Sequence, residues 1–116
     1  MNNPINIEGV RKTIFGAGTI DQIGHECKAL KASRALLVID RELAKTDIGA
    51  RAVESIRKSR VKGFLYPDVT PEPSPALADI GTDMAKREKV GCVIGIGGGS
   101  TMDVAKAISV LVTNGG

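Results

Sequence analysis

Three short apolar runs divide the chain, at residues 35–40, 63–66 and 91–96. Runs without alternating polar residues are typical of strands buried on both faces, as in parallel sheets. After each run, apolar residues recur every three or four positions, which predicts a helix with one buried face. This alternation predicts an α/β fold, a Rossmann-like parallel sheet with right-handed crossovers and helices on both faces.

Ordinary helix signals mark the ends of these three helices. Ser74 and Pro75 form an N-cap and first-turn pair, and basic residues near 57–60 and 86–89 suit helix C-termini. Pro67 is expected to close the second strand, and Asn114 with the glycines after it to stop the last helix. The predicted buried stripes are Ile48, Ala52, Val53 and Ile56; Leu77, Ile80 and Met84; and Val104, Ile108 and Leu111.

An additional strand and helix are expected before residue 35, N-terminal to the first apolar run. Loose alternation over residues 5–14 predicts one or two short strands. Gly16 and Gly18 are interpreted as a structural turn, because no long apolar strand precedes them. Thr19 and Gln22 form a capping-box pattern at the start of a helix. The apolar face of that helix is Ile20, Ile23, Cys27 and Leu30.

Composition limits the function classes. The 116 residues are 42% hydrophobic with a net charge of +3, which fits one soluble domain. Scattered cations and only 3% aromatic residues argue against nucleic-acid binding. No apolar run is long enough for a membrane span, and the N-terminus does not resemble a signal peptide. The expected compartment is the cytoplasm.

Residues that could ligate a metal are few. Cys27 and Cys92 lie among apolar neighbours, so we expect buried free thiols. His25 is the only histidine, and on its predicted helix it is expected to be solvated. We therefore expect that this chain alone builds no metal site.

The chemistry is expected at the glycine turn between the third strand and the last helix. The turn contains three consecutive glycines, Gly97, Gly98 and Gly99, and glycine loses more backbone entropy on folding than any other residue. A chain tolerates this cost most readily where another molecule must come close to bare backbone. A helix N-terminus favours an anion, and Ser100 can cap that helix or bond a phosphate oxygen. Asp103 is expected in the first helical turn, with Lys106 one turn further along. These residues predict a nucleotide-phosphate site, with a purely structural turn as the alternative.

Asp40 is the second candidate, at the end of the first apolar run. The carboxyl ends of strands are where open α/β sheets bind ligands. A carboxylate there can accept hydrogen bonds from both hydroxyls of an adenosine ribose and would repel a 2′-phosphate. The alternative is a plain cap of the following helix or loop.

The glycine turn also resembles the GGGSxxDxAK signature of the iron-containing, or group III, alcohol dehydrogenases; it reads GGGSTMDVAKA from Gly97 to Ala107. Segments 15–18, 38–40 and 71–74 are similar to other family segments, in the same order. The resemblance implies NAD(P)-linked oxidation of small alcohols and diols, or reduction of aldehydes. It implies that residues Gly97 to Ser100 hold the pyrophosphate, and that Asp40 contacts the ribose and favours NAD over NADP.

The resemblance further implies a catalytic divalent metal, usually Fe²⁺, held in the family by one aspartate and three histidines beyond the signature. We therefore expect residues 1–116 to be a truncated N-terminal NAD-binding domain, inactive alone, without the C-terminal helical metal domain. Glu72 and Gly91 depart from the family pattern, which has Asn and often Asp there. The candidate cofactor-binding residues are Asp40, Gly97, Gly98, Gly99, Ser100 and Asp103, with no catalytic or metal residue assigned.

Two other interpretations stay open. The first is a member of the related glycerol dehydrogenases and dehydroquinate synthases, which share the expected fold; glycerol dehydrogenases, however, generally carry lysine at the position of Ser100 and use zinc. The second is a non-catalytic nucleotide-binding or interaction module. An exposed sheet edge would favour self-association, and a homo-oligomer is expected.

Overall fold

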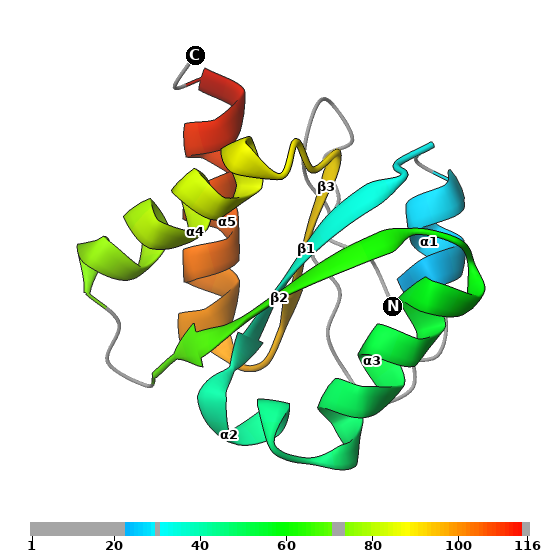
Figure 1. Ribbon diagram of the computed structural model, residues 1–116. Helices are drawn as coiled ribbons and strands as arrows, with labels where there is room; N and C mark the ends of the chain where they lie inside the picture. The colour runs from blue at the N-terminus through cyan, green and yellow to red at the C-terminus, as the bar shows by residue number, and fades with distance from the viewer. Residues whose placement is uncertain (1–22, 30, 71–73, 115–116) are drawn as a thin grey trace.

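A parallel sheet with its first strand in the middle organises the fold (Figure 1). The computed structural model describes residues 23–29, 31–70 and 74–114. Its strands are β1 (Arg34–Asp40), β2 (Lys62–Val69) and β3 (Cys92–Ile96), in the order β2-β1-β3. Both pairings of β1 are parallel, as the apolar runs predict.

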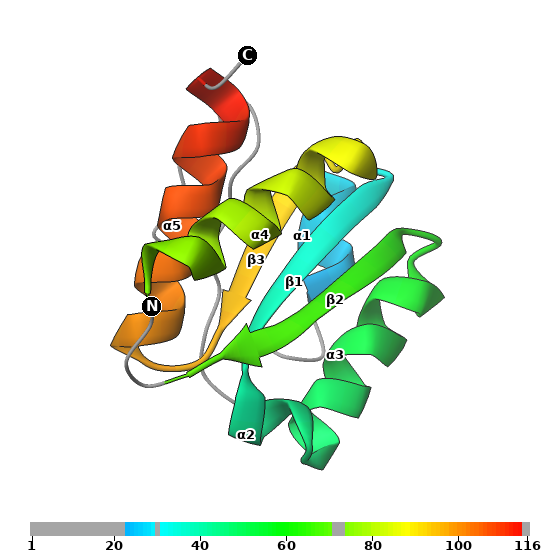
Figure 2. The same cartoon turned by 60° about the vertical axis from the view of Figure 1, so that its left-hand side comes forward.

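Helices cover both faces of this sheet. Those described are α1 (Ile23–Ala29), α2 (Arg41–Ala44), α3 (Asp47–Lys58), α4 (Pro75–Arg87) and α5 (Gly99–Asn114). Figures 1 and 2 show α1 and α3 on one face and α4 and α5 on the other, with the short α2 at the carboxyl end of β1. The predicted α/β architecture is confirmed.

Each face of the sheet packs its own hydrophobic cluster, because successive strand residues point to opposite sides. Leu37 and Ile39 of β1 belong to the cluster under α1 and α3, together with both cysteines. Leu36 and Val38 belong to the cluster under α4 and α5, together with Tyr66. Residues 35–39 are all buried, which accounts for the uninterrupted apolar run in the sequence.

Three helices end in the same backbone motif. After α1, α3 and α4, the residues Lys31, Arg60 and Lys89 have φ of 60°, 62° and 54°. The next residue donates its N–H five positions back, as Val61 does to the carbonyl of Ile56 at 3.1 Å. This is the Schellman C-cap, in which the left-handed position is usually glycine. Here a basic residue takes that position each time.

Two expectations about the helices and strands are wrong. Pro67 does not close β2: it lies inside the strand, where Tyr66 pairs with Val38 but Val69 pairs with Asp40. One extra residue on β2 makes this a bulge, a place where proline's missing N–H costs little. Three members of the predicted buried stripes, Ile80, Leu111 and Val53, are instead 53%, 38% and 42% exposed. The other members are buried or packed against the core, as predicted.

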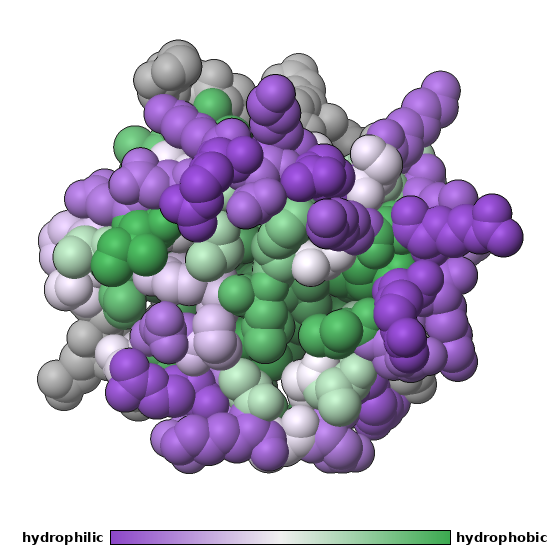
Figure 3. All heavy atoms as spheres, in the orientation of Figure 1, coloured by the Kyte–Doolittle hydropathy of each residue, from purple (hydrophilic) through white to green (hydrophobic). Residues whose placement is uncertain are grey.

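The free side of β2 carries an apolar hollow of about 450 Å³. Leu37, Ile56 and Val61 form its floor, while Val53 and Leu65 lie at its exposed rim. Figure 3 shows hydrophobic residues gathered in the middle of the face in view, with hydrophilic residues around them. Within the described residues β2 pairs only with β1, so this hollow borders an open sheet edge.

Several sequence expectations lie outside the described residues. They are the strands over 5–14, the turn at Gly16 and Gly18, the capping box at Thr19 and Gln22, and Glu72. In the part of the chain that the structure describes, no helix combines the length and apolar character needed to cross a bilayer.

Candidate functional site

The carboxyl ends of β1 and β3 bring the two candidate segments together. Ile39 pairs with Ile96, so Asp40 and Gly97 leave the sheet side by side. From β1 the chain continues into α2 and α3, whereas from β3 it enters α5 on the opposite face (Figure 2). Neighbouring strands whose connections diverge in this way form the topological switch point where open α/β sheets bind ligands.

Gly97 makes the turn possible. Its φ of +151° lies in a region that residues with a Cβ rarely adopt. A Cβ there would also lie 2.7 Å from Oγ1 of Thr101. Thr101 is buried, with 2% of its surface exposed, and its side chain lies next to Gly97 on the inner side of the turn. Sequence reasoning missed Thr101, although its position one helical turn after Gly97 places it under the loop.

Gly98 and Gly99 have a different environment. A Cβ built on either residue would meet nothing within 4 Å, and both are exposed. The fold itself therefore does not require glycine at these positions. Since glycine costs conformational entropy, its presence here is best explained by a molecule that approaches the backbone from outside. This is the space that the phosphate hypothesis needs.

The first turn of α5 faces that space. The helical hydrogen bonds start with the N–H of Met102, which donates to the carbonyl of Gly98 at 3.0 Å. The N–H groups before Met102 therefore precede the helical ladder, and the positive end of the helix dipole lies among them. Backbone donors and dipole together form an environment suited to an anion.

The start of α5 corrects two details. Gly99 is already helical, so Ser100 is the second helical residue and does not cap the helix. Asp103 lies beyond the first turn, which contains no acidic residue, and its side chain is exposed. Both expectations placed the helix start too late, because serine is a stronger N-cap residue than the glycines that precede it. Lys106 is exposed, as expected.

Asp40 caps α2. Its Oδ2 accepts the backbone N–H groups of Glu42 at 2.9 Å and Leu43 at 3.0 Å. The capping alternative is therefore confirmed. It leaves ribose binding open, because Oδ1 has no hydrogen-bond partner among the described residues. A carboxylate held by two backbone donors is well oriented for a further ligand.

The family's metal does not fit the described part of the chain. No three His, Cys, Asp or Glu side chains within it could hold a metal ion together. His25 lies exposed on α1, and Cys27 and Cys92 are buried and form no disulfide within the described residues, as expected.

Comparison with known proteins identifies the family. The model of the family "Iron-containing alcohol dehydrogenase" matches residues 10–116. NAD-dependent methanol dehydrogenase of Bacillus methanolicus is 32% identical over 104 residues, which are 90% of this chain and 27% of that protein. Sulfoacetaldehyde reductase of Bilophila wadsworthia is 37% identical over 107 residues, 92% of this chain and 28% of that protein.

Solved structures agree with this relationship. A 1,3-propanediol oxidoreductase matches with a TM-score of 0.79 at 27% identity, over 88% of this chain and 27% of that one. NADH-dependent butanol dehydrogenase A from Thermotoga maritima matches with a TM-score of 0.73 at 31% identity, over 90% and 26%. The chain thus spans about a quarter of the length of these relatives. The chain belongs to the iron-containing alcohol dehydrogenase family.

Proposed function

We propose that this chain is the NAD-binding portion of a metal-dependent dehydrogenase that interconverts small alcohols or diols and their aldehydes. The observation that carries the proposal is the open space over Gly98 and Gly99 at the N-terminus of α5. The pyrophosphate of the dinucleotide fits this place because it is anionic and needs close approach to backbone N–H groups. Relatives named as NAD-dependent and NADH-dependent dehydrogenases support the choice of cofactor.

The roles of the site residues follow from their positions. Gly97 shapes the turn, Gly98 and Gly99 admit the pyrophosphate, and Ser100 lies beside it with its hydroxyl as a further donor. Asp40 offers Oδ1 to the ribose hydroxyls and disfavours the 2′-phosphate of NADP by charge repulsion. Asp103 is the outermost candidate, exposed one turn along α5. The bound nicotinamide would supply hydride transfer.

Binding of ADP-ribose tests the glycine assignment. The double variant Gly98→Ala with Gly99→Ala has room for both methyl groups, so it should fold and bind ADP-ribose at least about tenfold more weakly in calorimetry. Gly91→Ala is the matched control, since its Cβ would make an ordinary 3.5 Å contact with Ala32 at the other end of β3. Equal affinities for all three proteins would refute the site.

The ribose assignment needs a gentler change than alanine, because Asp40 also caps α2. Asp40→Asn keeps an oxygen for the cap but removes the charge. We expect weaker binding of NAD and a smaller difference between NAD and NADP. If the preference between the two cofactors is unchanged, Asp40 is only a cap.

The metal and the reaction belong, in this proposal, to a longer protein. The described residues offer no donor set for iron, so we expect the chain of 116 residues to bind cofactor without turning over alcohols. Steady NADH production from 1,3-propanediol by the purified chain, without added metal, would contradict this. A chain that binds no nucleotide at all would leave only the structural interpretation of the glycine turn.

The proposal also includes self-association of the chain through the edge of β2. The open edge of β2 and the exposed Val53 and Leu65 form an apolar border that a second copy could cover. Light scattering with Leu65→Lys should then report smaller particles than the wild type. Val110→Lys is the matched control, since Val110 is 52% exposed on α5, away from this edge. A wild-type monomer at all concentrations would refute the assignment.

A further inference from the structure

A hollow lined by basic residues lies at the opposite end of the sheet from the glycine turn. The hollow has a volume of about 320 Å³ and is lined by Lys28, Lys31, Ala32, Ser33 and Arg60. Residues 31–33 immediately precede β1 and Arg60 lies shortly before β2, whereas Asp40 and Gly97 follow the ends of β1 and β3. The hollow is therefore formed by the amino ends of the strands and does not belong to the dinucleotide site.

Two of its cations are held in costly backbone conformations. Lys31 and Arg60 are the left-handed residues of the Schellman caps after α1 and α3, with φ of 60° and 62°. Glycine adopts this conformation without strain and is the usual residue there. Lys89 has the same conformation after α4, outside the hollow, so the angle itself belongs to the cap motif. Here the strain fixes the Cα of both basic residues at the border of one hollow.

The described residues leave the positive charge in the hollow without a compensating carboxylate, since none of those that line it is acidic. Among the described residues, Lys28, Lys31 and Arg60 have no ion-pair partner. The C-termini of α1 and α3 add partial negative charge, but three full positive charges outweigh two half charges. The Ser33 side chain, which is exposed, adds a hydroxyl donor.

We propose that this hollow binds a phosphate dianion, as inorganic phosphate or as a small phosphate monoester. Arg60 supplies a planar fork of donors that matches two phosphate oxygens, and Lys28 and Lys31 supply point charges around it. The volume exceeds that of one phosphate and leaves room for the carbon part of a monoester. This site is independent of the proposed dehydrogenase function.

Residue-resolved nuclear magnetic resonance tests the proposal on the chain itself. Inorganic phosphate and, in a separate arm, glycerol 3-phosphate are titrated at constant ionic strength set with sodium chloride. We expect saturable amide shifts at residues 31–33 and 60, separate from any shifts at residues 97–100. Tighter binding of glycerol 3-phosphate would identify the monoester as the ligand, and equal or weaker binding would identify free phosphate. Shifts confined to 97–100, or shifts that do not saturate, would overturn the proposal.

Glycine variants separate ligand binding from a structural role. Arg60→Gly and Lys31→Gly relieve the backbone strain, so both should fold and be at least as stable as the wild type. Each should weaken phosphate binding by about fivefold or more. Lys89→Gly is the matched control: it removes a cation from the same cap motif after α4, outside the hollow. Equal weakening in all three variants would show a general charge effect and refute the site.

Discussion

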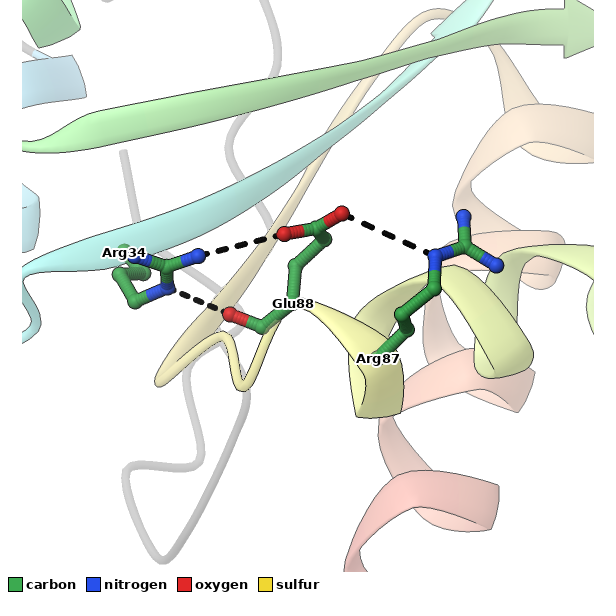
Figure 4. Close-up of polar contacts among 3 residues, drawn as sticks. All are labelled: Arg34, Arg87 and Glu88. Carbon is green, nitrogen blue, oxygen red and sulfur yellow. Dashed lines mark hydrogen bonds and ion pairs between the residues drawn. The ribbon is translucent and has the colours of Figure 1, made fainter.

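Arg34 and Glu88 form a two-point contact that joins the start of β1 to the C-cap of α4 (Figure 4). Nε of Arg34 donates to the backbone carbonyl of Glu88, and Nη2 donates to Oε1 of its carboxylate at 3.2 Å. The guanidinium also lies 5.0 Å from the ring centre of Phe64 on β2. One side chain thus connects β1, β2 and the turn that leads into β3.

Arg34→Lys should lower the free energy of unfolding by about 1 kcal/mol. Lysine keeps the charge but cannot make both contacts, and a value this small is expected because the side chains of Arg34 and Glu88 are 35% and 30% exposed. Urea denaturation measures the change. Glu54→Gln is the control, since it breaks the exposed pair with Arg57 on α3 and should leave the urea midpoint unchanged. Equal effects of both variants would contradict the special role of Arg34.

Alanine at the three turn glycines should give unequal stabilities. Gly97→Ala forces a Cβ against Thr101 in a strained conformation and should cost about 2 kcal/mol or more. Gly98→Ala and Gly99→Ala meet open space and should change stability by less than about 0.5 kcal/mol. Thermal unfolding without nucleotide ranks the three variants. A large loss at Gly98 or Gly99 would mean that the fold itself needs glycine there.

Tyr66 should make stability fall at high pH. It is 1% exposed and donates its hydroxyl to the carbonyl of Leu77 at 2.7 Å. Burial, and secondarily the charge of Asp68, raises the pKa of Tyr66 above 10.0. The neutral form is favoured in the folded state, so its stabilisation is complete below pH 10 and is lost as the pH rises through the raised pKa.

The variant Tyr66→Phe isolates this effect. It should cost about 1 kcal/mol at neutral pH, and its disadvantage relative to the wild type should shrink as the pH rises above 10. Urea midpoints between neutral and alkaline pH measure both quantities. Parallel curves for the two proteins would show that Tyr66 ionises equally easily in the folded and unfolded chain.

Lys89→Gly should stabilise the fold by about 0.5 kcal/mol. Relief of the left-handed conformation contributes about 1 kcal/mol, and loss of a cation near the C-terminus of α4 removes part of it. The measurement is the free energy of unfolding in urea. Lys89→Ala, which keeps a Cβ and loses the same charge, should be destabilising instead. A glycine variant no more stable than the alanine variant would refute the strain argument.

The strands and helices could be predicted because burial on both sheet faces leaves uninterrupted apolar runs. The helix faces could not be predicted as well. In α4 the buried residues are Gly81, Thr82 and Ala85, and a Cβ on Gly81 would lie 2.4 Å from Cδ1 of Ile108. Small residues let α4 and α5 approach closely, which turns the larger Ile80 outward. Hydrophobicity alone does not reveal a face built from small residues.

The candidate site was only partly predictable for a similar reason. The glycine turn was recognisable because three consecutive glycines are rare between a strand and a helix. The different roles of Gly97 and its two neighbours depend on what surrounds each Cα, which the sequence does not state. Asp40 was assigned two possible roles, and the cap depends on the short α2, whose four residues carry no helical periodicity.

The separation of the core into two clusters gives the molecule an independent natural reporter for each side of its sheet. Cys27 on α1 and Cys92 on β3, the only cysteines, belong to the cluster on the α1 and α3 side. Tyr66, the only tyrosine in a chain without tryptophan, belongs to the cluster on the α4 and α5 side. Thiol labelling and tyrosine fluorescence can therefore follow the opening of the two sides separately in the unmodified protein. Coincident transitions would show one cooperative unit, and displaced transitions would show that one layer of helices detaches first.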